Sequence, residues 1–288
     1  MTSITCIVPT HCRPIELNRA LTSILEQTAQ PTRILVVDDA RSPSTSSVVK
    51  SLQSAVDIEV LHTPWQKGSA SKSRNFGASR ATTKYLAFLD DDDYWHSEYL
   101  ESLLTRAEEK SADVVLGWIT LANGARTVGT RKPTIPMDEE STITANPGFT
   151  GSNFLIRRSC FDALGGFDPQ LPVYNDLDLL NRILAAELNV DVVKHPLVLQ
   201  TTDGGTHLSS RSKARALGID LYKQKYRSRL KRSGIRRLKR DKYVALRYPE
   251  QKAILRAWYY LLTIVHSDYS DLRRKLVKIV CREPVEYK

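Results

Sequence analysis

Short apolar runs alternate with amphipathic segments over the first 90 residues of the chain. The runs span residues 4–8, 34–37 and 85–89. A further run at 58–60, third in chain order, is interrupted by Glu59 and typical of an edge strand. Between them, apolar side chains recur at helical spacing, as at Leu17, Leu21 and Ile24, and further helices are expected around 48–52 and over 70–81. This alternation predicts a parallel sheet with right-handed crossovers.

The same pattern continues to about residue 210 and then changes. Helices are predicted over 98–110 and 159–164 and from Asn175 onward, and strands over 114–119, 151–156 and 190–199. Residues 123–149 are rich in Gly, Pro and Thr and are expected to form an irregular crossover, and 201–210 a polar loop. From residue 213 the pattern is helical and basic. The chain is therefore predicted to be α/β with a helical C-terminal extension.

Polar residues stand where three of the predicted strands end. The first strand is expected to end at Pro9, followed by Thr10 to Arg13; the second runs into Asp38 and Asp39; and the fourth runs into Asp90 to Asp93. In open parallel sheets, ligands bind beyond the carboxyl ends of the strands. Neither a G-x-G-x-x-G nor a G-x-x-x-x-G-K-[ST] sequence follows the first strand, so a bound nucleotide would depend on carboxylates, a cation and basic side chains.

The four consecutive aspartates, Asp90 to Asp93, favour binding of a cation. Two unit charges about 4 Å apart repel by roughly 4 kcal/mol at an effective dielectric constant of 20, and a bound cation relieves that repulsion. Carboxylate oxygens suit Mg²⁺ or Mn²⁺ shared with a substrate phosphate. In an extended chain, Asp90 and Asp92 would face one ion together, and Asp91 would point away. A solvated acidic loop is the alternative reading.

The net charge of +10 is unevenly distributed. Residues 211–288 hold 23 Lys and Arg against 7 Asp and Glu, whereas residues 1–210 hold 19 against 25. Such a basic region suggests an anionic partner. Three interpretations remain open: a solvated helix face, docking onto anionic lipid headgroups, and nucleic acid, for which no recognised motif accompanies the charge.

Cysteine usage and the N-terminal sequence suggest a reducing compartment. The four cysteines are scattered and no pair has the spacing of a metal site, which is typical of a cytoplasmic protein. No signal peptide is recognisable at the N-terminus, and the longest apolar run, 254–265, contains Arg256 and is too short to cross a bilayer.

Several motifs together resemble the family 2 glycosyltransferases of GT-A fold. The resemblance covers roughly residues 3–210 and does not extend to the basic region. The carrying sequences, in order, are Ile7-Val8-Pro9-Thr10 with Arg13-Pro14, Val36-Val37-Asp38-Asp39, Gly68 with Ser71-Lys72-Ser73-Arg74-Asn75-Phe76-Gly77, Phe88-Leu89-Asp90-Asp91-Asp92-Asp93, Gly165-Gly166-Phe167-Asp168 and Asn175-Asp176-Leu177-Asp178-Leu179.

The resemblance implies a GT-A nucleotide-diphospho-sugar transferase fold with a Rossmann-like, mostly parallel sheet. It implies a catalytic domain over 1–210, with a nucleotide-sugar-binding half at 1–110 and an acceptor-binding half at 111–210, before the basic helical region 211–288. Asp90 and Asp92 match the D-x-D positions that hold Mn²⁺ or Mg²⁺, and a late His207 is a further candidate ligand. The implied donor-binding residues are Pro9, Thr10, Arg13, Asp38, Asp39, Lys67, Arg74 and Asp91.

Asp176 matches the second residue of the family's Glu-Asp motif, which is the catalytic base. The first residue of the motif is Asn175 in this chain, and this departure leaves Asp178 as a further candidate. Both aspartates also suit the first turn of a helix, where the dipole favours carboxylates, so a purely structural role remains the alternative.

The expected function is therefore that of an inverting, hexosyltransferase-type enzyme. It would move a sugar from a nucleotide-sugar, with UDP the expected nucleotide, to a glycan or lipid-linked glycan in the synthesis of a surface polysaccharide such as lipopolysaccharide or capsule. We expect a cytoplasmic protein that associates peripherally with an anionic membrane through 211–288. A non-catalytic nucleotide-sugar- or glycan-binding module of the same fold is the alternative. A nucleotidyltransferase is disfavoured, because residues 9–14 lack a Gly-rich basic loop.

Overall fold

The structure is a computed structural model that describes residues 3–52, 56–65, 69–124, 126–202 and 212–267. The chain divides into two compact units, Met1–Gln170 with Asn175–Gly205, and Leu171–Tyr174 with Thr206–Lys288. The boundary predicted between residues 210 and 211 lies outside the described residues and stays a prediction.

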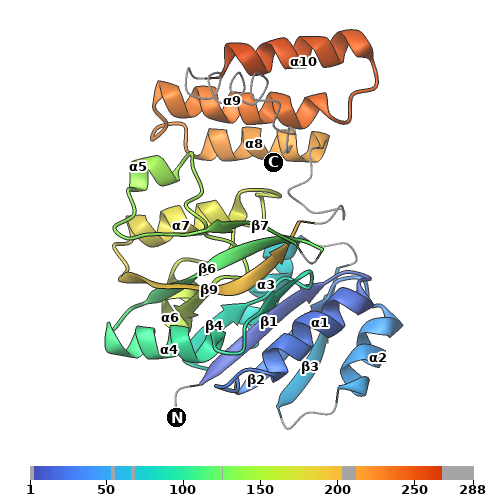
Figure 1. Ribbon diagram of the computed structural model, residues 1–288, viewed down its shortest axis with the longest axis vertical. Helices are drawn as coiled ribbons and strands as arrows, with labels where there is room; N and C mark the ends of the chain where they lie inside the picture. The colour runs from blue at the N-terminus through green and yellow to red at the C-terminus, as the bar shows by residue number, and fades with distance from the viewer. Residues whose placement is uncertain (1–2, 53–55, 66–68, 125, 203–211, 268–288) are drawn as a thin grey trace. The chain divides into compact units, whose positions relative to one another are not determined.

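The first unit contains a mixed α/β arrangement (Figure 1). Its strands are β1 (Ile4–Thr10), β2 (Arg33–Asp38), β3 (Asp57–His62), β4 (Tyr85–Phe88), β5 (Asp93–Trp95), β6 (Val114–Asn123), β7 (Arg126–Arg131), β8 (Phe154–Arg157) and β9 (Val190–Thr201). Its helices are α1 (Pro14–Leu25), α2 (Pro43–Ser51), α3 (Ala70–Ala78), α4 (Tyr99–Glu109), α5 (Glu139–Thr142), α6 (Arg158–Ala163) and α7 (Asn175–Ala185).

The described strands form one sheet in the order β3-β2-β1-β4-β8-β6-β9-β5, and β7 pairs with β6. Strands β3, β2, β1 and β4 are mutually parallel, with β3 at the edge, as the alternation of strands and helices predicts. Beyond β4 the sheet is mixed, because β8 runs antiparallel to both β4 and β6, while β6 and β9 are parallel. The predicted α/β fold class is confirmed.

Helices cover both faces of the sheet because alternate residues of each buried strand point to opposite sides. Cys6 and Val8 of β1 belong to a core cluster with Leu21 of α1 and Leu103 of α4. On the other face α3 approaches very closely: a Cβ on Gly77 would lie 2.6 Å from Ile7 Cγ2. Only glycine fits this contact, which fixes the position of α3 and of the polar residues that it carries.

Strand β1 continues through Pro9 to Thr10, so the expectation that Pro9 ends the strand is wrong. The pairing of β1 with β4 ends at Ile7 and Phe88. Ile7 O accepts from Leu89 N, so Pro9, two residues later, presents its missing N–H on the same side, where the ladder has already ended. Pro9 therefore removes no ladder hydrogen bond.

Two strands and one helix were not predicted from the sequence. Strand β5 begins at Asp93, the last residue of the acidic quartet. It pairs with the last residues of β9, where Asp93 lies opposite Gln200. Strand β7 and helix α5 lie within residues 123–149, which the composition predicts to be irregular. Strand β7 is a hairpin partner of β6 with a register shift at Leu121 and Ala122.

The second unit is helical where it is described, as the basic pattern after residue 213 predicts. It contains α8 (Lys213–Lys225), α9 (Arg232–Arg247) and α10 (Ala253–Val265), and α9 packs against both of the others (Figure 1). Ile219 and Tyr222 of α8 are buried, and the ring of Tyr222 lies 4.7 Å from that of Tyr226. Within the described residues, none of the helices combines the length and the apolar character that crossing a bilayer requires.

Candidate active site

The carboxyl ends of β1, β2 and β4 lie side by side and present polar side chains at one edge of the sheet. Thr10 at the end of β1 is in register with Asp38 at the end of β2, and Ile7 is in register with Phe88 at the end of β4. Asp90 to Asp93 follow directly after β4. The sequence-predicted residues of these three segments are thus brought to one place by the parallel register.

The acidic quartet forms a tight turn. Asp93 N donates to Asp90 O at 3.1 Å, so the expected extended conformation of residues 90–92 is wrong. The reason is that β5 reverses the chain to pair with β9. Asp91 turns inward, where its carboxylate accepts from Thr10 Oγ1 at 2.8 Å. Burial raises the pKa of Asp91 to about 6, outweighing this hydrogen bond and the charge of Arg13.

Arginines pair with three of these carboxylates. The Nη1 atom of Arg13 lies 3.2 Å from Asp91 Oδ1 and 3.0 Å from Asp92 Oδ2. Arg74 forms an ion pair with Asp90. Arg19 of α1 donates to the carbonyl oxygen of Asp92 at 2.7 Å. The mutual repulsion of the quartet is therefore offset by positive charge from α1, α3 and the loop before α1.

The carboxylates of the acidic turn differ in how far solvent reaches them. The side chains of Asp90 and Asp92 are 29% and 19% exposed, whereas that of Asp91 is 8% exposed. Asp93 is buried, and burial followed by the charges of Asp90 and Asp92 raises its pKa well above the usual range. Asp90 and Asp92 are thus the members that a soluble ion can reach. In the part of the chain that the structure describes, no three His, Cys, Asp or Glu side chains converge as a metal site.

Arg74 is nearly fully buried beside the acidic turn. Its guanidinium lies 5.0 Å from the centre of the Phe167 ring, in cation–π geometry. It also lies against the backbone of Gly151, where any Cβ would overlap the guanidinium. The contacts with Gly151 and Phe167 hold the guanidinium of Arg74 beside Asp90, with which it forms an ion pair.

Asn75, the residue after Arg74, holds the backbone of Phe167 in place. Asn75 Nδ2 donates to Phe167 O at 2.7 Å, and Asn75 Oδ1 accepts from Phe167 N at 2.8 Å. Gly166 has φ +70°, and a Cβ on it would lie 2.5 Å from Asn75 Oδ1. The Gly-Gly-Phe segment and the Arg-Asn pair of α3 are about 90 residues apart in the sequence. These hydrogen bonds join the two segments directly.

Asp176 lies in the first turn of α7 and is half-buried. Its Oδ1 accepts from Leu177 N at 2.7 Å. Burial raises the pKa of Asp176, and the Leu177 amide and the positive charges of Arg74 and Arg131 oppose this rise only in part. Because Arg74 also pairs with Asp90, it electrostatically links the candidate base to the acidic turn. A carboxylate with a raised pKa is a better proton acceptor than an ordinary one.

Asp178, the other candidate in this helix, has a structural position. It is fully buried and pairs with Arg182, with Nη2 to Oδ2 at 2.9 Å. Arg182 also donates to Leu164 O and Gly166 O, both at 2.7 Å. This network fixes the Gly165-Gly166 turn against α7, so the geometry favours Asp176 over Asp178 as the base.

Asp38 and Asp39 have different surroundings. Asp38 is fully buried, and its carboxylate oxygens accept from Ala40 N at 2.9 Å and Ser42 N at 2.8 Å. It thereby holds the turn between β2 and α2. Asp39 lies 2.6 Å from Nδ1 of the exposed His11. The donor-binding roles assigned to Pro9, Asp38 and Asp39 stay predictions, as do those of the other candidate residues.

Two predicted site residues, Lys67 and His207, lie outside the described residues. Conversely, the sequence did not point to His11, Arg19, Asn75 or Gly151 as parts of this site. Asn75 and Gly77 belong to the same recognisable motif as Arg74, so the motif was an available signal for Asn75. No local pattern distinguishes Arg19 or Gly151 from an ordinary surface arginine or loop glycine.

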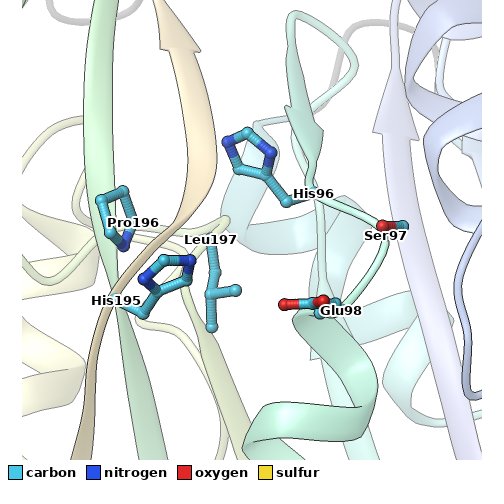
Figure 2. Close-up of a pocket in the computed structure, with 6 residues that line it drawn as sticks. All are labelled: His96, Ser97, Glu98, His195, Pro196 and Leu197. Carbon is cyan, nitrogen blue, oxygen red and sulfur yellow. The ribbon is translucent and has the colours of Figure 1, made fainter.

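A shallow pocket of about 480 Å³ lies elsewhere in the first unit, between the start of α4 and the middle of β9 (Figure 2). It is lined by His96, Ser97, Glu98, His195, Pro196 and Leu197, none of which is a predicted site residue. His96 N donates to Leu197 O at 2.9 Å, so the two walls are joined through their backbones. This pocket is separate in composition from the carboxylate site.

A family model described as "Glycosyl transferase family 2" matches residues 5–165. Among similar curated proteins, the poly(ribitol-phosphate) beta-N-acetylglucosaminyltransferase TarP of Staphylococcus aureus is 30% identical over 44% of this chain and 40% of its own length. The pre-mycofactocin glycosyltransferase of Mycobacterium tuberculosis is 30% identical over 71% of this chain and 43% of its own. The GalNAc(5)-diNAcBac-PP-undecaprenol beta-1,3-glucosyltransferase of Campylobacter jejuni is 36% identical over 40% of this chain and 37% of its own. The chain thus spans less than half the length of these relatives.

Solved structures with the same fold include residues 1–349 of S. aureus TarS in complex with UDP-GlcNAc. That structure superposes with a TM-score of 0.63 at 19% identity and covers 91% of this chain and 79% of the TarS chain. At this identity the likeness concerns the fold alone.

Proposed function

Because the chain belongs to glycosyl transferase family 2, we propose that it transfers a sugar from a nucleotide-sugar donor to a glycan or lipid-linked glycan acceptor. A UDP-sugar is the proposed donor. This choice is supported by the likeness of the fold to TarS in complex with UDP-GlcNAc. The acceptor class is supported by relatives whose names specify poly(ribitol-phosphate) and an undecaprenol-linked glycan.

One observation supports the proposal: Arg74 interacts with two candidate carboxylates that come from distant segments of the chain. It pairs with Asp90, and its charge acts on Asp176. A donor diphosphate is anionic and an acceptor hydroxyl needs a base, so this arrangement supplies both requirements within one site. A purely structural acidic turn would not need a carboxylate with a raised pKa facing it.

In the proposed reaction, the acceptor hydroxyl oxygen attacks the anomeric carbon. Asp176 accepts the hydroxyl proton, the new C–O bond forms, and the bond to the diphosphate oxygen breaks with its electron pair leaving on UDP. Direct displacement of this kind inverts the anomeric configuration, so an α-linked donor gives a β-linked product. Arg13 and Arg74 balance the charge that develops on the leaving diphosphate.

A divalent cation fits the acidic turn. Asp90 and Asp92 are the more exposed members of the quartet, although both are half-buried, and two carboxylates plus substrate phosphate oxygens form a common donor set for Mg²⁺ or Mn²⁺. We propose that these two residues hold the ion, which supplies Lewis-acid stabilisation of the leaving diphosphate when it is bound. Arg13, which spans Asp91 and Asp92, would then exchange one carboxylate partner for a phosphate.

Asp176→Asn is the direct test of the base. The variant is expected to bind UDP normally, because the amide has the same shape, and to lose transfer by at least about a hundredfold. Release of the nucleoside diphosphate, measured across UDP-, GDP- and dTDP-sugars, reports turnover and identifies the donor. The matched control is Asp162→Asn, at an exposed carboxylate of α6 that forms an ion pair with Arg158, and it should turn over normally. Normal turnover by Asp176→Asn would refute the assignment.

Asp92→Ala tests the proposed ion site separately. Calorimetry with UDP should show weaker binding in the presence of Mn²⁺ and little change in its absence. An equal loss with and without Mn²⁺ would contradict the ion site. If the unaltered protein binds UDP but neither transfers nor hydrolyses any donor, it is a binding module.

We further propose that region 211–288 places the enzyme at an anionic membrane surface on the cytoplasmic side. Its described part, 212–267, carries 16 Lys and Arg against 3 Asp and Glu. Lysines and arginines near an anionic surface contribute about 1 kcal/mol each to binding. The described cysteines, Cys6, Cys12 and Cys160, are free thiols, which suits a reducing compartment.

A further inference from the structure

Helix α10 exposes a stripe of large apolar side chains. Ile254 is 85% exposed, and Trp258, Leu261 and Val265 are each about half exposed. These residues are spaced by four, three and four positions, so they follow one face of the helix. Arg256 is the single charged residue within 253–265. A stripe of this kind is unfavourable in water and indicates an apolar partner.

The opposite side of α10 is already packed within the second unit. Thr263 is buried, and the rings of Tyr259 and His266 lie 6.4 Å and 5.5 Å from the ring of Tyr243 on α9. Over residues 259–266 the helix is therefore held by α9 along one face, and Leu261 and Val265 lie on the face that remains. Residues 253–258 are exposed on every side, so Ile254 and Trp258 continue the stripe beyond this contact.

Cationic side chains lie on other sides of α10 than the stripe. The guanidinium of Arg247 lies 5.1 Å from the centre of the Tyr260 ring, and Arg236 Nη2 lies 3.4 Å from Val265 O. Both arginines come from α9. Lys252 and Arg256, at the start of α10, are exposed. Positive charge thus lies near both ends of α10, on sides of the helix other than the apolar stripe.

We propose that this face of α10 inserts into the interface of an anionic lipid bilayer, with Ile254, Trp258, Leu261 and Val265 among the acyl chains. The arginines and lysines of α9 and α10 contact the headgroups. An aromatic side chain such as Trp258 suits the boundary between these two layers. This inference rests on the proposed membrane association of region 211–288 and identifies the surface that performs it.

Charge complementarity favours lipid over a second copy of this chain. Residues 212–267 carry 16 basic against 3 acidic residues, so two such faces would repel each other, whereas anionic headgroups attract this charge. Nucleic acid would use the positive charge but would leave the apolar stripe in water. An anionic bilayer is the partner that uses both features.

The experiment measures binding of the full chain to vesicles of phosphatidylcholine with about 30% phosphatidylglycerol and to vesicles of phosphatidylcholine alone. The test variant is the double substitution Ile254→Asn and Leu261→Asn. The matched control is Ile15→Asn, because Ile15 on α1 is 82% exposed but belongs to the first unit. We expect the double variant to bind anionic vesicles at least about tenfold more weakly, and the control to bind normally. Neutral vesicles and high salt should weaken binding of the unaltered protein.

Tryptophan fluorescence of the unaltered protein provides a second measurement, in which Trp258 is one of four tryptophans. Anionic vesicles should shift its emission to shorter wavelength and protect it from a soluble quencher, and Trp258→Phe should remove the change. Equal vesicle binding by the double variant, or an unchanged Trp258 signal, overturns the inference. So does a dimer of the unaltered protein that the double variant dissociates, or RNA binding that depends on the stripe. UDP release with a soluble acceptor is measured in parallel, so a failure of membrane binding is distinguishable from a failure of the proposed catalysis.

Discussion

The substitution Asn75→Ala tests the amide bridge that joins α3 to the Gly-Gly-Phe turn. The bridge consists of two hydrogen bonds, at 2.7 Å and 2.8 Å, to the backbone of Phe167, which is fully buried. Alanine leaves both backbone groups without that partner. An unsatisfied buried polar group costs about 1–3 kcal/mol, so the expected loss in the free energy of unfolding is roughly 2–4 kcal/mol. For a unit of this size, the loss corresponds to a fall in Tm of roughly 5–15 °C.

The assay is urea unfolding of the full chain followed by far-UV circular dichroism. Asn75→Asp retains the acceptor for Phe167 N but removes the donor to Phe167 O, so we expect it to be destabilised too. Ser79→Ala is the control just after α3, because Ser79 is exposed and its hydroxyl donates to Phe76 O, one turn back in the same helix. It should stay within about 0.5 kcal/mol of the unaltered protein. A similar small effect for Asn75→Ala would refute the structural role of the bridge.

Three further predictions follow from the same contacts. Gly151→Ala should displace the Arg74 guanidinium and weaken UDP binding about tenfold in calorimetry, while Gly129→Ala, whose Cβ would meet only an ordinary contact at 3.8 Å, should not. Because burial raises the pKa of Asp176 above 3.8, kcat should fall as pH drops through that raised value, and a kcat that stays constant down to about pH 4 would contradict this. Burial alone would raise the pKa of Asp220, but hydrogen bonds from two lysines outweigh it and lower the pKa below 3.8. The ionised carboxylate therefore stabilises the folded protein above pH 3.8, and this stabilisation is lost as pH falls through the pKa of Asp220 in the folded state. Asp220→Asn should therefore cost up to about 1 kcal/mol at pH 7 in thermal unfolding, and the difference should close in acid.

The regular elements of the first unit were predictable because each depends on a local pattern. The spacing of Leu17, Leu21 and Ile24 specifies α1, and the run at 34–37 specifies β2. By contrast, β5 is three residues long and exists because Asp93 to Trp95 pair with β9, about a hundred positions further along the chain. No window of local sequence contains that information.

The candidate site shows the same division. Its carboxylates were identified because they follow buried strands, and the parallel register brings those strand ends together. The side-chain directions were not predictable from the period of an extended chain, because the return of β5 turns residues 90–93. The pairing of Arg13 with two aspartates likewise depends on the loop conformation before α1, where Cys12 has φ 54°. That backbone angle is a tertiary outcome, which spacing alone does not indicate.

The arginine partners of the acidic turn bear on how this protein can be purified and stored. With Asp90 held by Arg74, and Asp91 and Asp92 by Arg13, the electrostatic cost of assembling the turn is met by the chain itself. Maturation therefore requires no ion, and preparations stripped with a chelator should retain their native dichroism and melting profile. If the proposed ion binds at Asp90 and Asp92, we expect it to be lost and regained repeatedly without passing through an unfolded state.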